Sequence, residues 1–349
     1  MGEKNTREYG LDLLKIIAFL CVANLHILAD AWYELPADTM PWQMINAMRN
    51  TWCVPVFVMI SGRFILDPNK PMPAAKIRRY FFRAVKAFAV FSVLYKGLDF
   101  VRQGMDPAWF ADWKWQLTDL VDGEYHLWYL VMLVGLYLIT PLLRKITEDR
   151  KLTEQFLILF FSFECLRQYG VHIPKVGILL QPILDNMGFH FALGYSGYFV
   201  LGYYLAQRSF SPRQERMIYV AGLICLIAGY AGNSIYTLAS GEKSAMFTEP
   251  LTPNLIVVST AVFVFFAHRV NRTCLSERMV SWIFKLEPYC FGAYLIHVFF
   301  VNIAIDYFPI AGGVVHPVLA ALVQTSLVAW ASLLCCWLWK NLCCQGKKS

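Results

Sequence analysis

Residues 11–26, LDLLKIIAFLCVANLH, predict an apolar helix that carries three ionisable side chains, Asp12, Lys15 and His26. At ~3.6 residues per turn these three fall, with Phe19 and Val22, inside an arc of roughly 80°. One face of the helix is therefore polar at both ends and apolar between them, and it is expected to contact protein or water because lipid tolerates charge poorly. Lys15 and His26 are ~16 Å apart along the axis, about half of a ~30 Å hydrocarbon core, so they can serve opposite halves of a membrane.

The composition extends this inference to the whole chain. Of 349 residues, 58% are hydrophobic and 16% are charged, and the mean hydropathy is +0.47. These values exclude a soluble domain and predict an all-α, polytopic membrane bundle of about ten transmembrane helices. Apolar windows place the spans near 11–30, 44–65, 80–100, 125–143, 153–170, 189–207, 216–238, 252–268, 288–306 and 315–340.

Basic residues divide unequally between the two sides of this arrangement. Most Lys and Arg residues of the connections fall on one side, and the other side holds Arg102, Lys114, Arg167, Lys175 and Lys243. The positive-inside rule therefore predicts that both termini are cytoplasmic. No internal repeat is evident, so we expect one domain over 1–349 with no appended soluble domain.

His26 is the first candidate for chemistry, because it lies near the outer end of the first span. A neutral imidazole there can act as a general base on a hydroxyl group, since its ordinary pKa of ~6.5 is close to working pH. The alternative is a histidine that only forms a hydrogen bond to another helix. Asp12 is ~21 Å from His26 along the helix, so it is expected to pair with Lys15 instead.

Two further candidates belong to the predicted outer half. Arg49, about 10 Å deep in the predicted second span, either binds an oxyanion or sugar carboxylate or extends toward the water. His126, in Glu124-Tyr-His-Leu-Trp128, suits a glycan site because it adjoins aromatic residues; the alternative is a solvated histidine in an interfacial aromatic belt. The outer connection at 101–124 adds aromatic side chains, Trp109, Trp113 and Trp115, with Trp128 just beyond.

A basic strip, Lys76, Arg78, Arg79 and Arg83, opens the predicted third span on the cytoplasmic side. Lys76, Arg79 and Arg83 have the spacing of one helix face, which suits a ligand with several phosphates. Binding to anionic lipid is the alternative. His297 is either a helix–helix hydrogen bond or part of a substrate passage, and glycines 188, 194, 197 and 202 are expected to allow close helix packing.

Four motifs occur in register along the chain. They are Leu11-Asp12-Leu13-Leu14-Lys15 followed by His26, Val54-Pro55-Val56-Phe57-Val58-Met59-Ile60-Ser61-Gly62, His126-Leu127-Trp128-Tyr129-Leu130, and Tyr294-Leu295-Ile296-His297. In this order they resemble the acyltransferase family 3 of membrane O-acyltransferases. Members of that family carry an arginine where this chain has Lys15, and their basic Arg-x-x-Arg motif is matched only loosely, as Lys76-x-x-Arg79 or Arg79-x-x-x-Arg83.

The resemblance implies an integral membrane O-acyltransferase of the bacterial cytoplasmic membrane. It would move an acyl group, usually acetyl from cytoplasmic acetyl-CoA, to a hydroxyl of an extracytoplasmic or lipid-linked glycan. His26, His126 and Arg49 are then the catalytic candidates, and Lys15 with the basic strip is the candidate site for the coenzyme A phosphates. Neither a metal nor a nucleic acid is expected, and the oligomeric state is not indicated.

A polyprenyl-linked glycan transporter or flippase is the alternative function, because it would share the bundle, the outer aromatic residues and the basic inner surface. The absence of internal repeats and of a carboxylate near the membrane midplane counts against it. Asp12, Glu164 and Glu287 are interpreted as peripheral.

Overall fold

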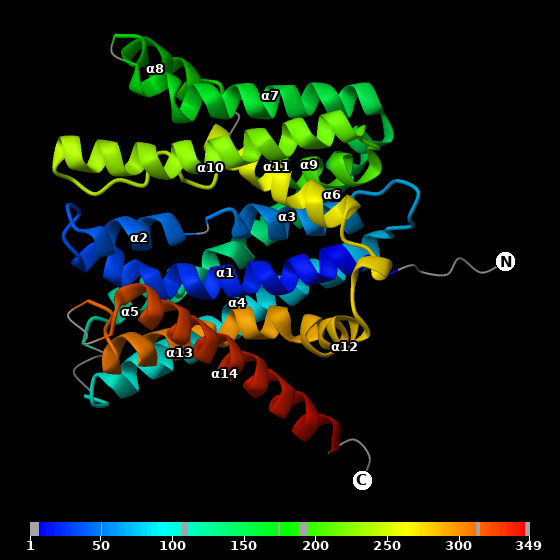
Figure 1. The fold of residues 1–349 in the computed structure, drawn as a ribbon. Helices are drawn as coiled ribbons and strands as arrows, with labels where there is room; N and C mark the ends of the chain where they lie inside the picture. Colours follow the sequence, from blue (N-terminus) through cyan, green and yellow to red (C-terminus); the bar gives the residue numbers. More distant parts are fainter. Residues whose placement is uncertain are drawn as a thin grey trace. The chain divides into compact units, whose positions relative to one another are not determined.

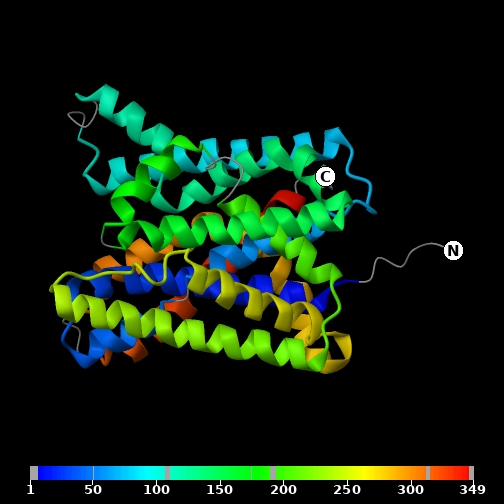
Figure 2. The ribbon, with the colours of Figure 1, turned by 90° about the horizontal axis from the view of Figure 1, so that it is seen from above.

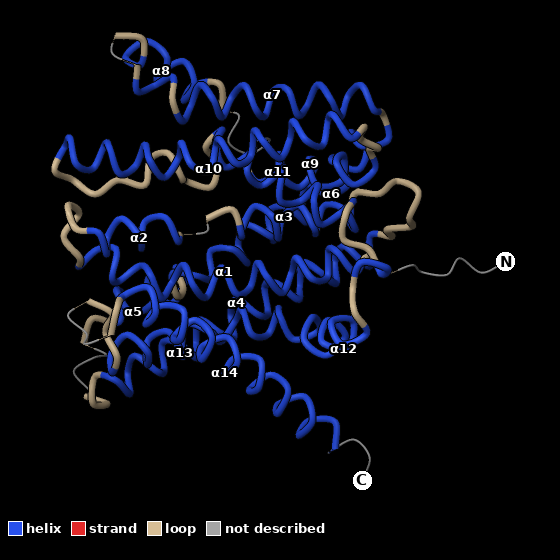
Figure 3. The backbone as a smooth tube through the Cα atoms, in the orientation of Figure 1, coloured by secondary structure: helices blue, strands red, loops and turns tan. Residues whose placement is uncertain are grey.

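The computed structural model describes residues 7–49, 51–106, 111–173, 175–188, 194–311 and 315–345. Within these ranges all regular structure is helical (Figures 1 and 3), so the predicted all-α class is confirmed. In chain order the helices are α1 Tyr9–Glu34, α2 Met40–Met48, α3 Cys53–Ile65, α4 Ala74–Arg102, α5 Trp113–Asp122, η2 Tyr125–Leu127, α6 Trp128–Glu148, α7 Arg150–Gln168, η3 Gly170–His172, α8 Gly177–Asn186, α9 Tyr195–Gln207, α10 Pro212–Ser240, α11 Pro253–His268, η5 Arg272–Cys274, α12 Glu277–Leu286, η6 Glu287–Tyr289, α13 Cys290–Tyr307 and α14 Pro317–Gln345.

Every predicted span contains helix. Five segments of the described chain are long and apolar enough to cross a membrane: Tyr9–Glu34, Tyr125–Glu148, Pro212–Ser240, Glu277–Tyr307 and Pro317–Leu342. The chain is thus a polytopic helical membrane protein, and the number of about ten crossings stays a prediction. Two of the connections predicted to be outer contain the short helices α5 and α8, and one predicted to be cytoplasmic contains α12; the sequence pattern predicts none of these helices.

The predicted second span, 44–65, is wrong as a continuous helix. It is broken between α2 and α3, and Arg49 lies at the break instead of inside a helix. The reason is Pro55, whose ring would clash with the Thr51 carbonyl in an unbroken helix and whose nitrogen has no hydrogen to donate. Groups at the break have partners from elsewhere: the Tyr230 hydroxyl donates to the Arg49 carbonyl, and the Thr51 hydroxyl donates to the Thr248 carbonyl at 2.7 Å.

The contacts divide the chain into two compact units, Met1–Phe64 with Asp149–Ser349, and Ile65–Glu148. We describe each unit by itself. In the first unit α1 packs against α2, α11, α13 and α14 (Figure 1). Its core at the C-terminal half of α1 combines Ile27, Leu28 and Trp32 with residues of the other helices, and all of them are buried. Figure 2 shows α10 and α11 running side by side in the same unit.

Glycines bring helices of the first unit into backbone contact. A Cβ atom added to Gly62 of α3 would overlap the Phe199 carbonyl of α9, and one added to Gly202 of α9 would overlap the Met59 carbonyl of α3. A Cβ at Gly197 would likewise overlap the Phe160 ring of α7. The packing predicted for Gly197 and Gly202 is therefore confirmed.

The other two predicted glycines do not pack in this way. Gly188 and Gly194 have φ values of +63° and +66°, which L-residues rarely adopt. A Cβ on Gly188 would meet nothing within 4 Å, and one on Gly194 would meet only Leu251 at 3.9 Å. The prediction is wrong for these two positions, where glycine serves the backbone turn.

The second unit contains α4, α5, η2 and α6. Helices α4 and α6 pack together along their lengths, and α5 contacts α4. At one end, Arg144 of α6 donates hydrogen bonds to the backbone carbonyls of Ile65, Asp67 and Lys70 at 2.6–2.9 Å. These bonds hold the turn that leads into α4, and so they fix where the basic strip begins.

Candidate functional site

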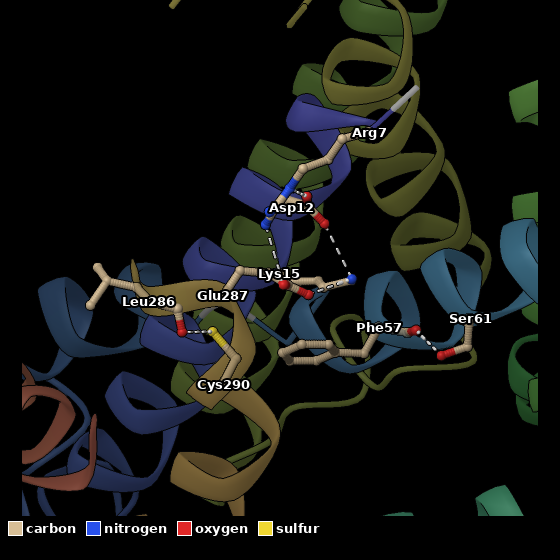
Figure 4. A network of polar contacts seen from close by, with 8 residues as sticks. All are labelled: Arg7, Asp12, Lys15, Phe57, Ser61, Leu286, Glu287 and Cys290. Atoms are coloured by element: carbon tan, nitrogen blue, oxygen red, sulfur yellow. Dashed lines mark hydrogen bonds and ion pairs between the residues drawn. The ribbon is translucent and has the colours of Figure 1, made fainter. Parts of the chain in front are cut away.

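The N-terminal end of α1 joins a network of four charged side chains (Figure 4). The Lys15 ammonium lies 2.8 Å from a Glu287 carboxylate oxygen and 3.3 Å from an Asp12 oxygen. Arg7 reaches the same two carboxylates, at 2.5 Å from Asp12 and 3.4 Å from Glu287. The predicted Asp12–Lys15 pair is confirmed, and the two cations are balanced by two anions.

Glu287 is a residue that the sequence interpretation placed at the periphery. Its side chain is only 21% exposed and it accepts hydrogen bonds from both Lys15 and Arg7. No local pattern could have assigned it, because 272 residues separate it from Lys15. The Lys15 side chain is held by carboxylates here, so its predicted binding to coenzyme A stays a prediction.

Glu287→Gln should destabilise the first unit, because it leaves Lys15 and Arg7 with one carboxylate between them. We expect a loss of about 1–2 kcal/mol, less than a fully buried pair would give because these side chains are partly exposed. Thermal unfolding of the detergent-solubilised protein measures this loss of stability. Adding Lys15→Met to the Glu287→Gln variant should then lower the stability little further.

Glu277→Gln on the neighbouring α12 is the matched control for that variant. Glu277 pairs with Arg272, but its side chain is 85% exposed, so its removal should change stability little. Equal melting temperatures for the Glu277 and Glu287 variants would contradict a structural role for the network.

The C-terminal half of α1 places His26 beside His297 of α13. The two imidazole centroids are 5.3 Å apart, and the ring planes are inclined at 39°. His297 is fully buried, and its Nδ1 lies 2.6 Å from the Tyr294 carbonyl oxygen. A carbonyl can only accept, so Nδ1 of His297 carries the proton, and Nε2 of the neutral ring has the lone pair.

The same two helix segments are therefore joined at two levels. Lys15 meets Glu287 at one level, and His26 meets His297 at the other, ~15–16 Å further along both helices. This spacing requires α1 and α13 to run parallel. The ion-pair network thus fixes the register in which the two imidazoles meet.

The residues between these levels are tightly packed. Phe19 is fully buried and lies edge-on to the His297 ring, with centroids 6.3 Å apart, and Val22 is also buried. Further along α1, the Asn24 amide donates to the Thr325 hydroxyl of α14 at 3.1 Å. Phe19 and Val22 thus occupy the apolar middle of the helix face that the sequence predicts.

Arg49 lies at the α2–α3 break with its guanidinium 4.4 Å above the Trp32 ring of α1. Its Nε and Nη1 atoms are buried and have no hydrogen-bond partner among the described residues. Trp32 is itself held by its indole N–H, which donates to Asn46 at 3.2 Å. A buried guanidinium with free donors can bind an anionic oxygen.

His126 belongs to the second unit, in η2 at the start of α6. It is 1% exposed, so the alternative of a solvated histidine is wrong. The Tyr95 ring of α4 lies edge-on to it, with centroids 5.1 Å apart. Trp113, Trp115 and Trp128 are exposed, whereas Trp109 lies outside the described residues.

The basic strip forms the first turns of α4. Arg78, Arg79 and Arg83 are exposed and Lys76 is half-buried. Among the described residues, Lys76, Arg78 and Arg79 form no ion pair with a carboxylate, in contrast to Lys15. Basic residues at a helix N-terminus oppose the helix dipole, so an anion bound there would stabilise this end of α4.

The predicted site residues thus belong to two units. The first unit contains Lys15, His26 and Arg49, and it adds His297 and Glu287; the second contains His126 and the basic strip. His297 was within reach of sequence reasoning, since its motif had been recognised. Glu287 was not.

The first unit thus contains a pair of imidazoles on α1 and α13 and a buried guanidinium above the Trp32 ring of α1. Residues 8–339 match the family described as acyltransferase domain, and the chain belongs to this family of membrane acyltransferases. Comparisons with curated proteins and with solved structures give no match.

Proposed function

We propose that this acyltransferase is an O-acetyltransferase that moves an acetyl group from cytoplasmic acetyl-CoA to a hydroxyl of an extracytoplasmic or lipid-linked glycan. The observation that supports this most directly is the His26–His297 pair, 5.3 Å between ring centroids, on two parallel helices of an acyltransferase domain. A bacterial cytoplasmic membrane would give the enzyme access to the donor on one side and the acceptor on the other.

In the proposed reaction His26 is the general base. It takes the proton of the acceptor hydroxyl while the oxygen attacks the thioester carbonyl, and the C–S bond breaks as the new C–O ester bond forms. The proton then passes from His26 to the departing thiolate, so the products are the acetyl ester and free coenzyme A. His297, whose Nδ1 proton is held by the Tyr294 carbonyl, would position His26 and accept a proton at Nε2.

The coenzyme A phosphates are assigned to the basic strip. Its arginines are exposed and, Arg83 apart, form no ion pair within the described chain, and arginine binds phosphate in a bidentate manner. Lys15 is already paired with Asp12 and Glu287, so we assign it first to the register of α1 and α13. Arg49 is assigned to an anionic oxygen of a substrate, with His126 on the acceptor side.

Transfer of radiolabelled acetyl from acetyl-CoA into glycan, in membranes that contain the protein, tests this function. Label should enter material that mild alkali releases as acetate, because that treatment cleaves O-acetyl esters. Arg78→Gln with Arg79→Gln should raise the KM for acetyl-CoA about tenfold or more, since each phosphate contact contributes ~1–3 kcal/mol. Lys145→Gln, an exposed residue of the same unit, is the control and should leave the KM unchanged.

The transporter alternative gives a different result in the same assay. It requires movement of a lipid-linked glycan without acetyl-CoA and no incorporation of label. Absence of label in all glycan fractions, together with glycan movement that depends on the protein, would overturn the acetyltransferase proposal.

A further inference from the structure

The second unit contains a polar cavity of about 270 Å³ between α4, α5 and the turn before η2. Eight residues line it: Ser92, Tyr95, Lys96, Asp99, Asp119, Gly123, Glu124 and Tyr125. Ligand pockets for drug-sized molecules usually measure about 300–1,000 Å³. The volume therefore suits a single small ring rather than an extended chain.

Ser92 is the clearest sign that the cavity takes a ligand. This residue is 4% exposed, and its hydroxyl is buried without a hydrogen-bond partner among the described residues. Gly123, opposite, keeps the space open, because an added Cβ would come within 2.9 Å of both the Ser92 hydroxyl and the Phe88 ring. A buried hydroxyl without a partner is costly, so a polar ligand at this place would stabilise the site.

The charges of the cavity decide which ligand it accepts. Lys96 of α4 forms an ion pair with Asp119 of α5, and the carboxylates of Asp99 and Glu124 also border the cavity, so its lining has three carboxylates and one ammonium group. Burial raises the pKa of the Glu124 carboxyl and the nearby Asp99 raises it further, while the cations Arg102 and Lys96 offset part of this rise. A second negative charge from a ligand would be repelled.

Aromatic rings complete the lining. Tyr95 and Tyr125 both border the cavity, and both rings lie edge-on to the buried His126, with centroids 5.1 and 5.8 Å away. Outside the lining, the Trp115 ring centroid of α5 lies 4.5 Å from the ammonium of Lys96. Carboxylates that accept from hydroxyl groups, a serine hydroxyl and aromatic rings together suit a polyhydroxylated ring.

We propose that this cavity is the acceptor subsite and that it binds one hydroxyl-rich sugar ring without a negative charge. That the bound sugar is the acceptor rests on the proposed function, but binding of the sugar can be measured without any acyl transfer. Uronates and sugar phosphates are excluded, because Asp99 and Glu124 would face their charge. His126 lies against the Tyr95 and Tyr125 rings, where it would fix the orientation of that wall.

The experiment is ligand-observed NMR on the purified full chain in detergent, with methyl glucoside, glucosamine and glucuronate as probes. Methyl glucoside and glucosamine should bind, and glucuronate should bind at least tenfold more weakly. Ser92→Ala should weaken the binding of methyl glucoside about fivefold, because one hydrogen bond is lost. The double variant Asp99→Asn, Glu124→Gln should weaken the binding of methyl glucoside about tenfold and should reduce the discrimination against glucuronate. Asp122→Asn, an exposed aspartate of α5 outside the cavity, should change neither.

Three results would overturn the subsite: no binding of either uncharged or amine-bearing sugar, equal binding of glucuronate by the unaltered protein, or no effect of the Ser92 and Asp99/Glu124 variants. None of these depends on acyl transfer. Sugar binding without any transfer of acetyl would therefore leave the subsite standing and count against the proposed function. Transfer of acetyl without sugar binding would support the proposed function and overturn the subsite.

Discussion

His26→Ala should abolish acetyl transfer while the protein continues to accumulate in the membrane. General base catalysis contributes about a hundredfold to ten-thousandfold to a rate, so a loss of this size is expected in kcat. The side chain is not part of the charged network of α1, and stability should therefore change little. Initial rates of labelled acetyl transfer, normalised to the amount of folded protein, measure the effect.

The variant His297→Gln tests whether His297 acts by accepting a proton or only by packing against His26. Because His297 is assigned to positioning, we expect a smaller loss of about tenfold or more and a shift in the pH profile of kcat, with the KM for acetyl-CoA unchanged. His172→Ala, an exposed histidine of η3, is the matched control and should behave as the unaltered enzyme. A fully active His26→Ala enzyme would contradict the proposed mechanism.

Gly62→Ala and Gly202→Ala should each disrupt the first unit. At both positions the added Cβ would overlap a backbone carbonyl of the facing helix, and a backbone carbonyl cannot rotate away as a side chain can. We expect a destabilisation of about 3 kcal/mol or more, at or above the upper end for overpacking. Thermal stability in detergent, followed by size-exclusion chromatography, measures it.

Gly97→Ala is the control for the glycine variants. Gly97 lies in α4, and a Cβ there would meet nothing within 4 Å. Alanine has a higher helix propensity by up to ~1 kcal/mol, so this variant should be neutral or slightly more stable. If Gly202→Ala were as stable as Gly97→Ala, the close crossing of α3 and α9 would be contradicted.

Much of the architecture is predictable because its causes are local. Long apolar windows lie within helices, and basic residues flank them, as expected where the bilayer sets the length and hydropathy of each span. The break at Arg49 had a local signal as well: Pro55 follows six residues later, and its effect on the preceding turn accounts for the separation of α2 from α3.

The sites are predictable only in part. Lys15 and His26 stand out in the sequence because ionisable groups in an apolar helix require an explanation. His297, the partner of His26, belongs to a recognised motif, but Glu287, the partner of Lys15, does not. Glu287 resembles any carboxylate near a helix end until α13 packs against α1 and brings it to Lys15. In the second unit, Ser92 likewise resembles any serine in a span until packing buries it.

The sequence by itself therefore determined that residues 11–26 form an apolar helix with Lys15 toward one end and His26 toward the other. Hydropathy and the 3.6-residue period act along a few turns of chain, and they are readable without knowledge of the fold. Only the tertiary structure decided that Glu287 and His297 complete this face, because α13 is brought to α1 by packing between segments about 270 residues apart. Side-chain partners at that separation depend on which helices pack together and in which register, and no short stretch of sequence contains that information.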